Sequence, residues 1–193
     1  MAQSAWKRFP VPEFDYRSLK GLTYAPPKAI SSDDASRIVE AANASDASAA
    51  GGYAVEPDPA LLERLSFAGD VRQMILCALP GDDRHLLARS NAWFNQQVFV
   101  LDANAEKGEI LFDWQTPRPN NTRLGPEDGV ALDRSVIYLL SGRVLDDHTR
   151  GNRLIIDADW DPGDGRQGFR VLAGCDEGED NFHDSYFELS WKG

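Results

Sequence analysis

The sequence predicts an α+β fold in which short N-terminal helices precede a six-stranded antiparallel β-meander sheet. Two observations predict it. Apolar residues follow a helical spacing before Trp93 and alternate with a period of two after it. The alternating segments then form three consecutive pairs, each joined by turn-forming residues. The chain has 193 residues, 42% of them hydrophobic, which suffices for one core. We therefore expect an arm over residues 1–30 and a single domain over 31–193, with helices in 32–90 and the sheet in 93–191.

The arm over residues 1–30 combines proline with large apolar side chains. Its four prolines exclude a continuous helix. Six large apolar side chains are too many for a free linker: Trp6, Phe9, Phe14, Tyr16, Leu22 and Tyr24. We expect an arm that wraps the domain and anchors these side chains in its surface. The alternative is a docking segment for another protein.

Four short helices are expected before Trp93, each beginning at a serine or aspartate that can cap the first turn. Their expected ranges are 32–42, 58–69, 70–79 and 82–89. Pro59 directly follows the capping Asp58, which is the favoured place for proline at a helix start. Because the helices are short, packing must stabilise them.

Six strands are expected after Trp93, arranged as three hairpins: 94–102 with 109–114, 135–145 with 153–160, and 168–173 with 185–191. The second strand of each hairpin ends in tryptophan, at Trp114, Trp160 and Trp191. Each indole shares a face with apolar neighbours two and four residues earlier. We interpret the three as mostly buried on one sheet face. The alternative is an aromatic platform for a ligand.

The turn at 162–165, with the sequence Pro-Gly-Asp-Gly, joins two strands in a register that is consistent in charge and polarity. A four-residue loop there places Asp157 opposite Arg170 and Ile156 opposite Val171, so that opposite charges and apolar side chains each face one another. The same loop would place residue 161 opposite 166 and residue 158 opposite 169.

A calcium loop is the alternative for the same segment, because Asp157, Asp159 and Asp161 have the opening spacing of an EF-hand. Pro162 stands where that loop needs its turn glycine, and Gly168 stands where it needs a bidentate glutamate. Carboxylates on alternate strand residues also lie too far apart to converge on one ion. We therefore expect no calcium there.

Charge is distributed unevenly along the chain. The net charge of −11 disfavours nonspecific binding to nucleic acid or to an anionic membrane. Residues 157–188 hold ten acidic and two basic side chains, net −8, whereas residues 1–30 hold five basic and two acidic, net +3. The predicted partner-binding residues lie in or beside an acidic loop of the first segment: Asp176, Glu177, Glu179, Asp180 and Asp184.

Catalytic signatures are absent: the sequence has no GxSxG elbow, P-loop, GxGxxG or HExxH. Imidazoles and carboxylates could meet at a metal only if the second and third hairpins are adjacent. The candidates for such a site are His148, His183, Asp147 and Asp157. We expect neither a metal nor a cofactor, and a non-catalytic role is favoured while enzymatic activity stays open.

The expected function is therefore that of an acidic binding protein that masks a basic surface on a protein partner, as an inhibitor or immunity-type protein does. Two alternatives remain: a metal-dependent enzyme that uses loop His and Asp residues, and an assembly subunit that docks through its arm. There is no secretory signal and no apolar run of the ~20 residues a membrane span needs. The two cysteines form no disulfide framework. We therefore expect a cytoplasmic location, and the sequence predicts no oligomeric state.

Overall fold

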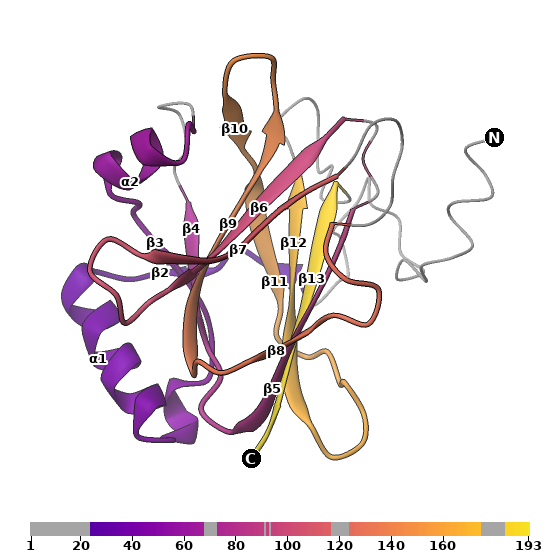
Figure 1. Ribbon diagram of the computed structural model, residues 1–193. Helices are drawn as coiled ribbons and strands as arrows, with labels where there is room; N and C mark the ends of the chain where they lie inside the picture. Colours follow the sequence, from indigo (N-terminus) through magenta and orange to yellow (C-terminus); the bar gives the residue numbers. More distant parts are fainter. Residues whose placement is uncertain (1–23, 68–72, 91, 93, 117–123, 175–183) are drawn as a thin grey trace.

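The structure is a computed structural model that describes all residues except 1–23, 68–72, 91, 93, 117–123 and 175–183. In the described part, two sheets pack face to face, and two helices cover the outer side of one of them (Figure 1). Helix α1 spans Ser32–Asn43 and α2 spans Pro59–Arg64, with a short 3₁₀ turn at Ala47–Ala49 between them. The layers are therefore sheet A, sheet B and helices.

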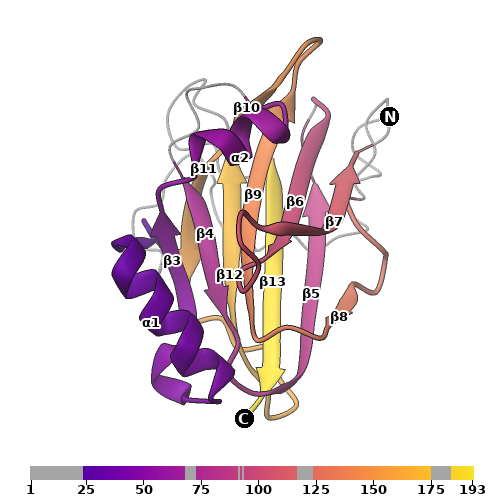
Figure 2. The same ribbon diagram turned by 60° about the vertical axis from the view of Figure 1, so that its left-hand side comes forward.

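Sheet A has the strand order β1-β11-β12-β13-β5-β8, and each neighbouring pair is antiparallel. Its strands are β1 (Tyr24–Ala25), β5 (Asp82–Ser90), β8 (Val130–Leu132), β11 (Arg153–Asp157), β12 (Gln167–Gly174) and β13 (Ser185–Lys192). Figure 2 shows the central strands β12, β13 and β5 running side by side.

Sheet B has the order β2-β3-β4-β9-β6-β7, with β10 attached to β9. Its strands are β2 (Lys28–Ala29), β3 (Gly51–Val55), β4 (Met74–Ala78), β6 (Gln96–Asp102), β7 (Glu109–Gln115), β9 (Val136–Val144) and β10 (Thr149–Gly151). The β2–β3 pair is parallel and the other pairs are antiparallel.

Two cores lie on opposite sides of sheet B. The first, between the sheets, includes Ile75 and Cys77 of β4. The second, under the helices, includes Leu76 and Ala78 of the same strand. Because successive side chains of a strand point to opposite faces, β4 contributes to both cores, and all five of its residues are buried.

The predicted α+β fold with a single meander sheet is wrong, because the third and fourth expected helices are the strands β4 and β5. Strand β4 is a continuous apolar run, which has no alternation to distinguish it from a buried helix. Strand β5 alternates between the inward Leu86 and Ala88 and the outward His85 and Arg89, but Leu87 on the outward side obscures the pattern. Long-range pairing with β13 decides its conformation.

The first expected helix is confirmed, and the second is confirmed at its start, although α2 ends at Arg64 rather than near residue 69. The cap of α1 is Ser31, whose hydroxyl accepts from the backbone N–H of Asp34, rather than Ser32. The cap of α2 is Asp58, as predicted, with Pro59 at the first helical position. No helix in the described part of the chain is long and apolar enough to cross a membrane.

The hairpin register around the turn at 162–165 is confirmed in part: Ile156 pairs with Val171 and Asp157 with Arg170. Strand β11 ends at Asp157, so the pairings expected beyond it do not form. The expected first and third hairpins are the pairs β6–β7 and β12–β13. The second is wrong, because β9 pairs with β10 in sheet B while β11 lies in sheet A.

The expected arm contributes two short strands, because residues 24–29 contain β1 at the edge of sheet A and β2 at the edge of sheet B. Residues 1–23, which include five of the six large apolar side chains, lie outside the described part. The proposed boundary between arm and domain at residue 30 remains a prediction.

Candidate functional site

The outer face of sheet A carries polar side chains on its central strands. On β13, Phe187, Leu189 and Trp191 point into the core between the sheets, so the alternating residues Glu188 and Ser190 point outward. The same alternation places Phe169 and Val171 of β12 inward and Arg170 outward. A polar group at the middle of a sheet is held by well-packed strands on both sides, which gives it a fixed position.

Arg170 and Glu188 form an ion pair across the β12–β13 ladder. They are directly opposite in the register, and Nε of Arg170 lies 3.3 Å from Oε1 of Glu188. The two side chains are only 20% and 24% exposed. A positive and a negative side chain, both largely buried, therefore lie side by side at the surface of sheet A.

Burial shifts the pKa values of two side chains in this patch. It raises the pKa of Glu188, and the nearby guanidinium groups of Arg170 and Arg89 oppose that effect only in part. The pKa of Tyr186, two residues earlier on the same face, is raised by burial and by the charge of Glu188. Hydrogen bonds to a carboxylate in such an environment are stronger than in open water.

Trp160 extends the patch beyond β12. Its indole lies against Gly168, where an added Cβ would come within 2.9 Å of the ring carbon Cζ3, so glycine makes room for the ring. The guanidinium carbon of Arg170 lies 4.9 Å from the indole centroid, within the range of a cation–π interaction. Arg170 thus contacts an aromatic ring on one side and a carboxylate on the other.

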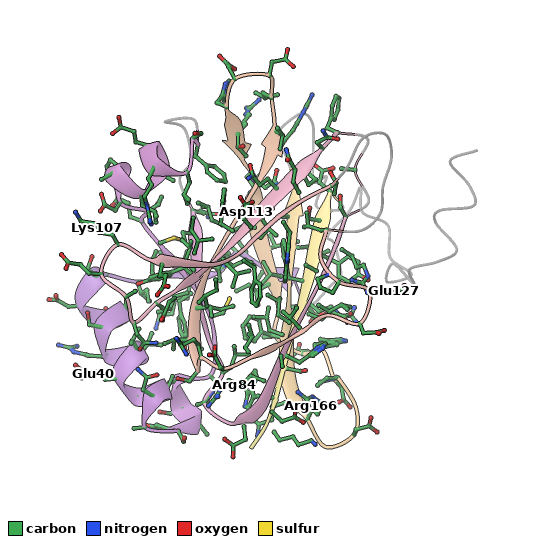
Figure 3. All side chains as sticks on the ribbon, viewed as in Figure 1. Glu40, Arg84, Lys107, Asp113, Glu127 and Arg166 are labelled. Atoms are coloured by element: carbon green, nitrogen blue, oxygen red, sulfur yellow. The ribbon has the colours of Figure 1, made fainter. Side chains whose placement is uncertain are left out.

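A second arginine lies at the lower end of the patch, beside the connection from β11 to β12 (Figure 3). Nε of Arg166 donates to Oγ of Ser190 at 3.1 Å, and its Nη1 lies 2.7 Å from Oδ2 of Asp83. Lys192 also pairs with Asp83, at 2.9 Å. These bonds hold Arg166 in one orientation.

We call this patch the sheet A face. Its members share an outward position on or beside β12, β13 and β5 and are partly or largely buried: His85, Trp160, Arg166, Arg170, Glu188 and Ser190. Adjacent strands lie about 4.8 Å apart, so the distance from β12 to β5 is roughly 10 Å. The sheet A face therefore spans three adjacent strands at the middle of the sheet.

The predicted partner-binding site falls mostly outside the described residues, which exclude Asp176, Glu177, Glu179 and Asp180. Asp184 is described and is only 7% exposed. Its backbone carbonyl accepts a 2.8 Å hydrogen bond from the Ser90 hydroxyl. A buried position beside a strand is unsuited to long-range steering, although the role of the loop itself remains a prediction.

Of the metal candidates, the described part of the chain brings together only the sequence neighbours His148 and Asp147, at the tip of the β9–β10 hairpin. Asp157 lies in sheet A, where its carboxylate accepts from the backbone N–H of Asp159. His183 is outside the described residues. Among those described, no group of three His, Cys, Asp or Glu side chains is placed to hold a metal ion.

The three tryptophans have three different environments. Trp191 is 3% exposed and belongs to the core between the sheets. Trp114 is half-buried on β7, stacked on Phe112 at a centroid distance of 4.9 Å. Trp160 is half-buried on the sheet A face. The prediction of three buried indoles on one sheet face is wrong, because β7 and β13 belong to different sheets and Trp160 lies beyond the end of β11.

No family model and no curated protein matches the sequence. Solved structures similar to the chain include three bacterial lectins, each covered over 95–96% of its length by 61% of this chain. A Ralstonia solanacearum high-affinity mannose-binding lectin has 16% identity and a TM-score of 0.46. A Chromobacterium violaceum lectin in complex with α-methyl-fucoside has 15% identity and a TM-score of 0.44. The C-terminal domain of a Burkholderia cenocepacia lectin has 12% identity and a TM-score of 0.45. These values do not assign the chain to a family.

These structures correct the predicted function. The three similar structures are lectins, one described as mannose-binding and one in complex with a fucoside, whereas we had expected an inhibitor or immunity-type protein that masks a basic protein surface. The expected basic protein partner is therefore wrong. The alternatives of a metal-dependent enzyme and an arm-docked subunit stay predictions. Sequence reasoning missed the Arg170–Glu188 pair because it matched Arg170 with Asp157 alone.

Proposed function

We propose that this protein binds an uncharged carbohydrate on the sheet A face. The observation that carries the proposal is the half-buried Arg170–Glu188 ion pair beside the Trp160 ring. The proposal rests on this geometry and not on the likeness to lectins.

The chemistry of the pair suits hydroxyl groups. A sugar hydroxyl both donates and accepts, so adjacent hydroxyls can donate to the Glu188 carboxylate and accept from the Arg170 guanidinium. Hydrogen bonds to charged groups contribute about 1.5–3 kcal/mol each. The apolar C–H face of a sugar ring can pack on an indole such as that of Trp160, which combines aromatic area with a polar edge.

The charge balance of the sheet A face favours a neutral ligand over an anion. Arg170 already faces Glu188, and Arg166 already faces Asp83. An anionic ligand would have to compete with these carboxylates for each guanidinium. A neutral polyhydroxylated ligand instead adds hydrogen bonds to both members of a pair without separating them.

A glycan array followed by titration calorimetry tests the proposal. We expect saturable binding to one class of neutral glycan, with methyl α-mannoside and methyl α-fucoside as the first soluble probes. Glu188→Gln keeps the shape of the side chain and removes its charge, so it should weaken binding about tenfold or more. Trp160→Ala should weaken it by a similar factor through lost ring contact.

Glu109→Gln is the matched control, because Glu109 is exposed on β7 of the other sheet and undergoes the same change in charge. It should bind like the wild type. Absence of binding to every neutral glycan would refute the proposal. Equal affinities for the wild type, Glu188→Gln and Trp160→Ala would place the binding site elsewhere.

A further inference from the structure

The helical layer leaves a groove on the opposite side of sheet B from sheet A. Two adjoining hollows of about 770 and 550 Å³ lie between the helices and the sheet. They share Ile30, Val55 and Glu56, so they form one elongated groove with Glu56 at its middle. Each hollow has the size of a small-molecule site, which is typically about 300–1,000 Å³.

The floor of the groove is apolar, and the charged side chains among the described residues that line it are all carboxylates. Side chains of the core under the helices form the floor: Val55, Leu62, Phe67, Met74 and Tyr138. Three carboxylates line it, from Glu40, Glu56 and Glu63, and no Lys, Arg or His is among the described residues that line either hollow. Burial raises the pKa of Tyr138, which agrees with a desolvated floor.

The basic side chains of the two helices are held by other partners. Nη1 of Arg37 on α1 lies 3.3 Å from Oδ1 of Asp34. Nη2 of Arg64 on α2 donates at 2.6 Å to the backbone carbonyls of Lys107 and Gly108. Within the described part of the chain, Glu40, Glu56 and Glu63 form no ion pair, so their carboxylates can face a ligand.

We propose that this groove binds a small organic cation with an apolar body, of the alkylammonium class. The apolar part matches the floor, and the positive charge matches the carboxylates, of which Glu56 borders both hollows. An aromatic ring such as that of Tyr138 adds a favourable surface for an ammonium group. This site is separate from the sheet A face and does not depend on the sugar proposal.

Titration calorimetry of the full chain with hexyltrimethylammonium tests the inference, with hexanesulfonate as a probe of the same apolar length and opposite charge. We expect saturable one-site binding of the ammonium, weaker at higher salt, and none of the sulfonate. Glu56→Gln should weaken ammonium binding about five- to tenfold, as expected for one carboxylate near a cation. Because Glu56 is exposed, this variant should fold normally, which circular dichroism can verify.

Two control variants make the result specific to the groove. Glu109→Gln removes an exposed carboxylate from β7 and should leave ammonium binding unchanged. Trp160→Ala removes the indole of the sheet A face, which could itself attract a cation, and should also leave it unchanged. The inference is overturned by absent ammonium binding, by equal binding of the sulfonate, or by equal weakening in Glu56→Gln and either control.

Discussion

Replacement of Trp191 by alanine is the most demanding test of the two-sheet architecture. The indole is 3% exposed in the core between the sheets, and its centroid lies 6.3 Å from that of Phe169 at an interplanar angle of 67°. The chain also passes closely over it, since a Cβ at Gly81 would lie 2.5 Å from the ring carbon Cδ1. The site has little freedom to collapse around a cavity.

Large-to-small changes at such positions cost about 3–5 kcal/mol for tryptophan. With an m-value of about 2–3 kcal/mol per molar urea, Trp191→Ala should lower the unfolding midpoint by about 1–2.5 M. Circular dichroism is the suitable probe, because the substitution removes a fluorophore. Trp160→Ala, on the half-buried outer position, should cost less than half as much. Equal losses for the two variants, or a loss under about 1 kcal/mol for Trp191→Ala, would refute the assigned layers.

Three further predictions concern charge and backbone strain. Because burial raises the pKa of Glu188 in the folded protein, the folded state holds this proton more tightly than the unfolded state. The free energy of unfolding should therefore fall as pH rises from the ordinary glutamate range to the raised pKa. Urea titrations at several pH values should show this slope in the wild type and not in Glu188→Gln. A slope that persists in the variant would contradict the assignment to Glu188. Burial acts to raise the pKa of Asp102, but hydrogen bonds from a neighbouring asparagine and arginine outweigh it and lower the pKa. Stabilisation by Asp102 should be present above the ordinary aspartate range and lost as pH falls through the lowered pKa, so Asp102→Asn should cost about 1–3 kcal/mol at neutral pH and nothing in strong acid. Gly163 and Gly129 have φ of +75° and +76°, but an alanine Cβ meets nothing within 4 Å at the first and lies 2.6 Å from a backbone carbonyl oxygen at the second. Denaturation should show a cost of about 1–2 kcal/mol for Gly163→Ala and a larger one for Gly129→Ala, and equal costs would show that the close approach is absent.

Local signals in the sequence predicted the elements that depend on local interactions. The capping Asp58 and the following Pro59 were sufficient to place the start of α2. The turn at 162–165 was sufficient to pair Asp157 with Arg170. Alternation likewise located the strands β6, β7, β9, β12 and β13 within a few residues. These features depend on neighbours in the chain, which a sequence displays directly.

The assignment of strands to two sheets could not be predicted, because it depends on contacts between distant residues. Strand β4 is covered on both faces, by sheet A and by α1, so its apolar run has no period. The same limit applies to the site. Alternation placed Glu188 on a polar face, but its pairing with Arg170 requires the register of β12 against β13, and the contact with Trp160 requires the loop after β11.

Amide chemical-shift mapping with the tightest-binding neutral glycan from the array locates the binding surface. We expect the shifts to concentrate on β5, on residues 160–171 and on β13, around Arg170 and Glu188. We also expect them to weaken in Glu188→Gln. Shifts that instead cluster on α1, α2 and β3, or that are unaffected by this substitution, would contradict carbohydrate binding on the sheet A face.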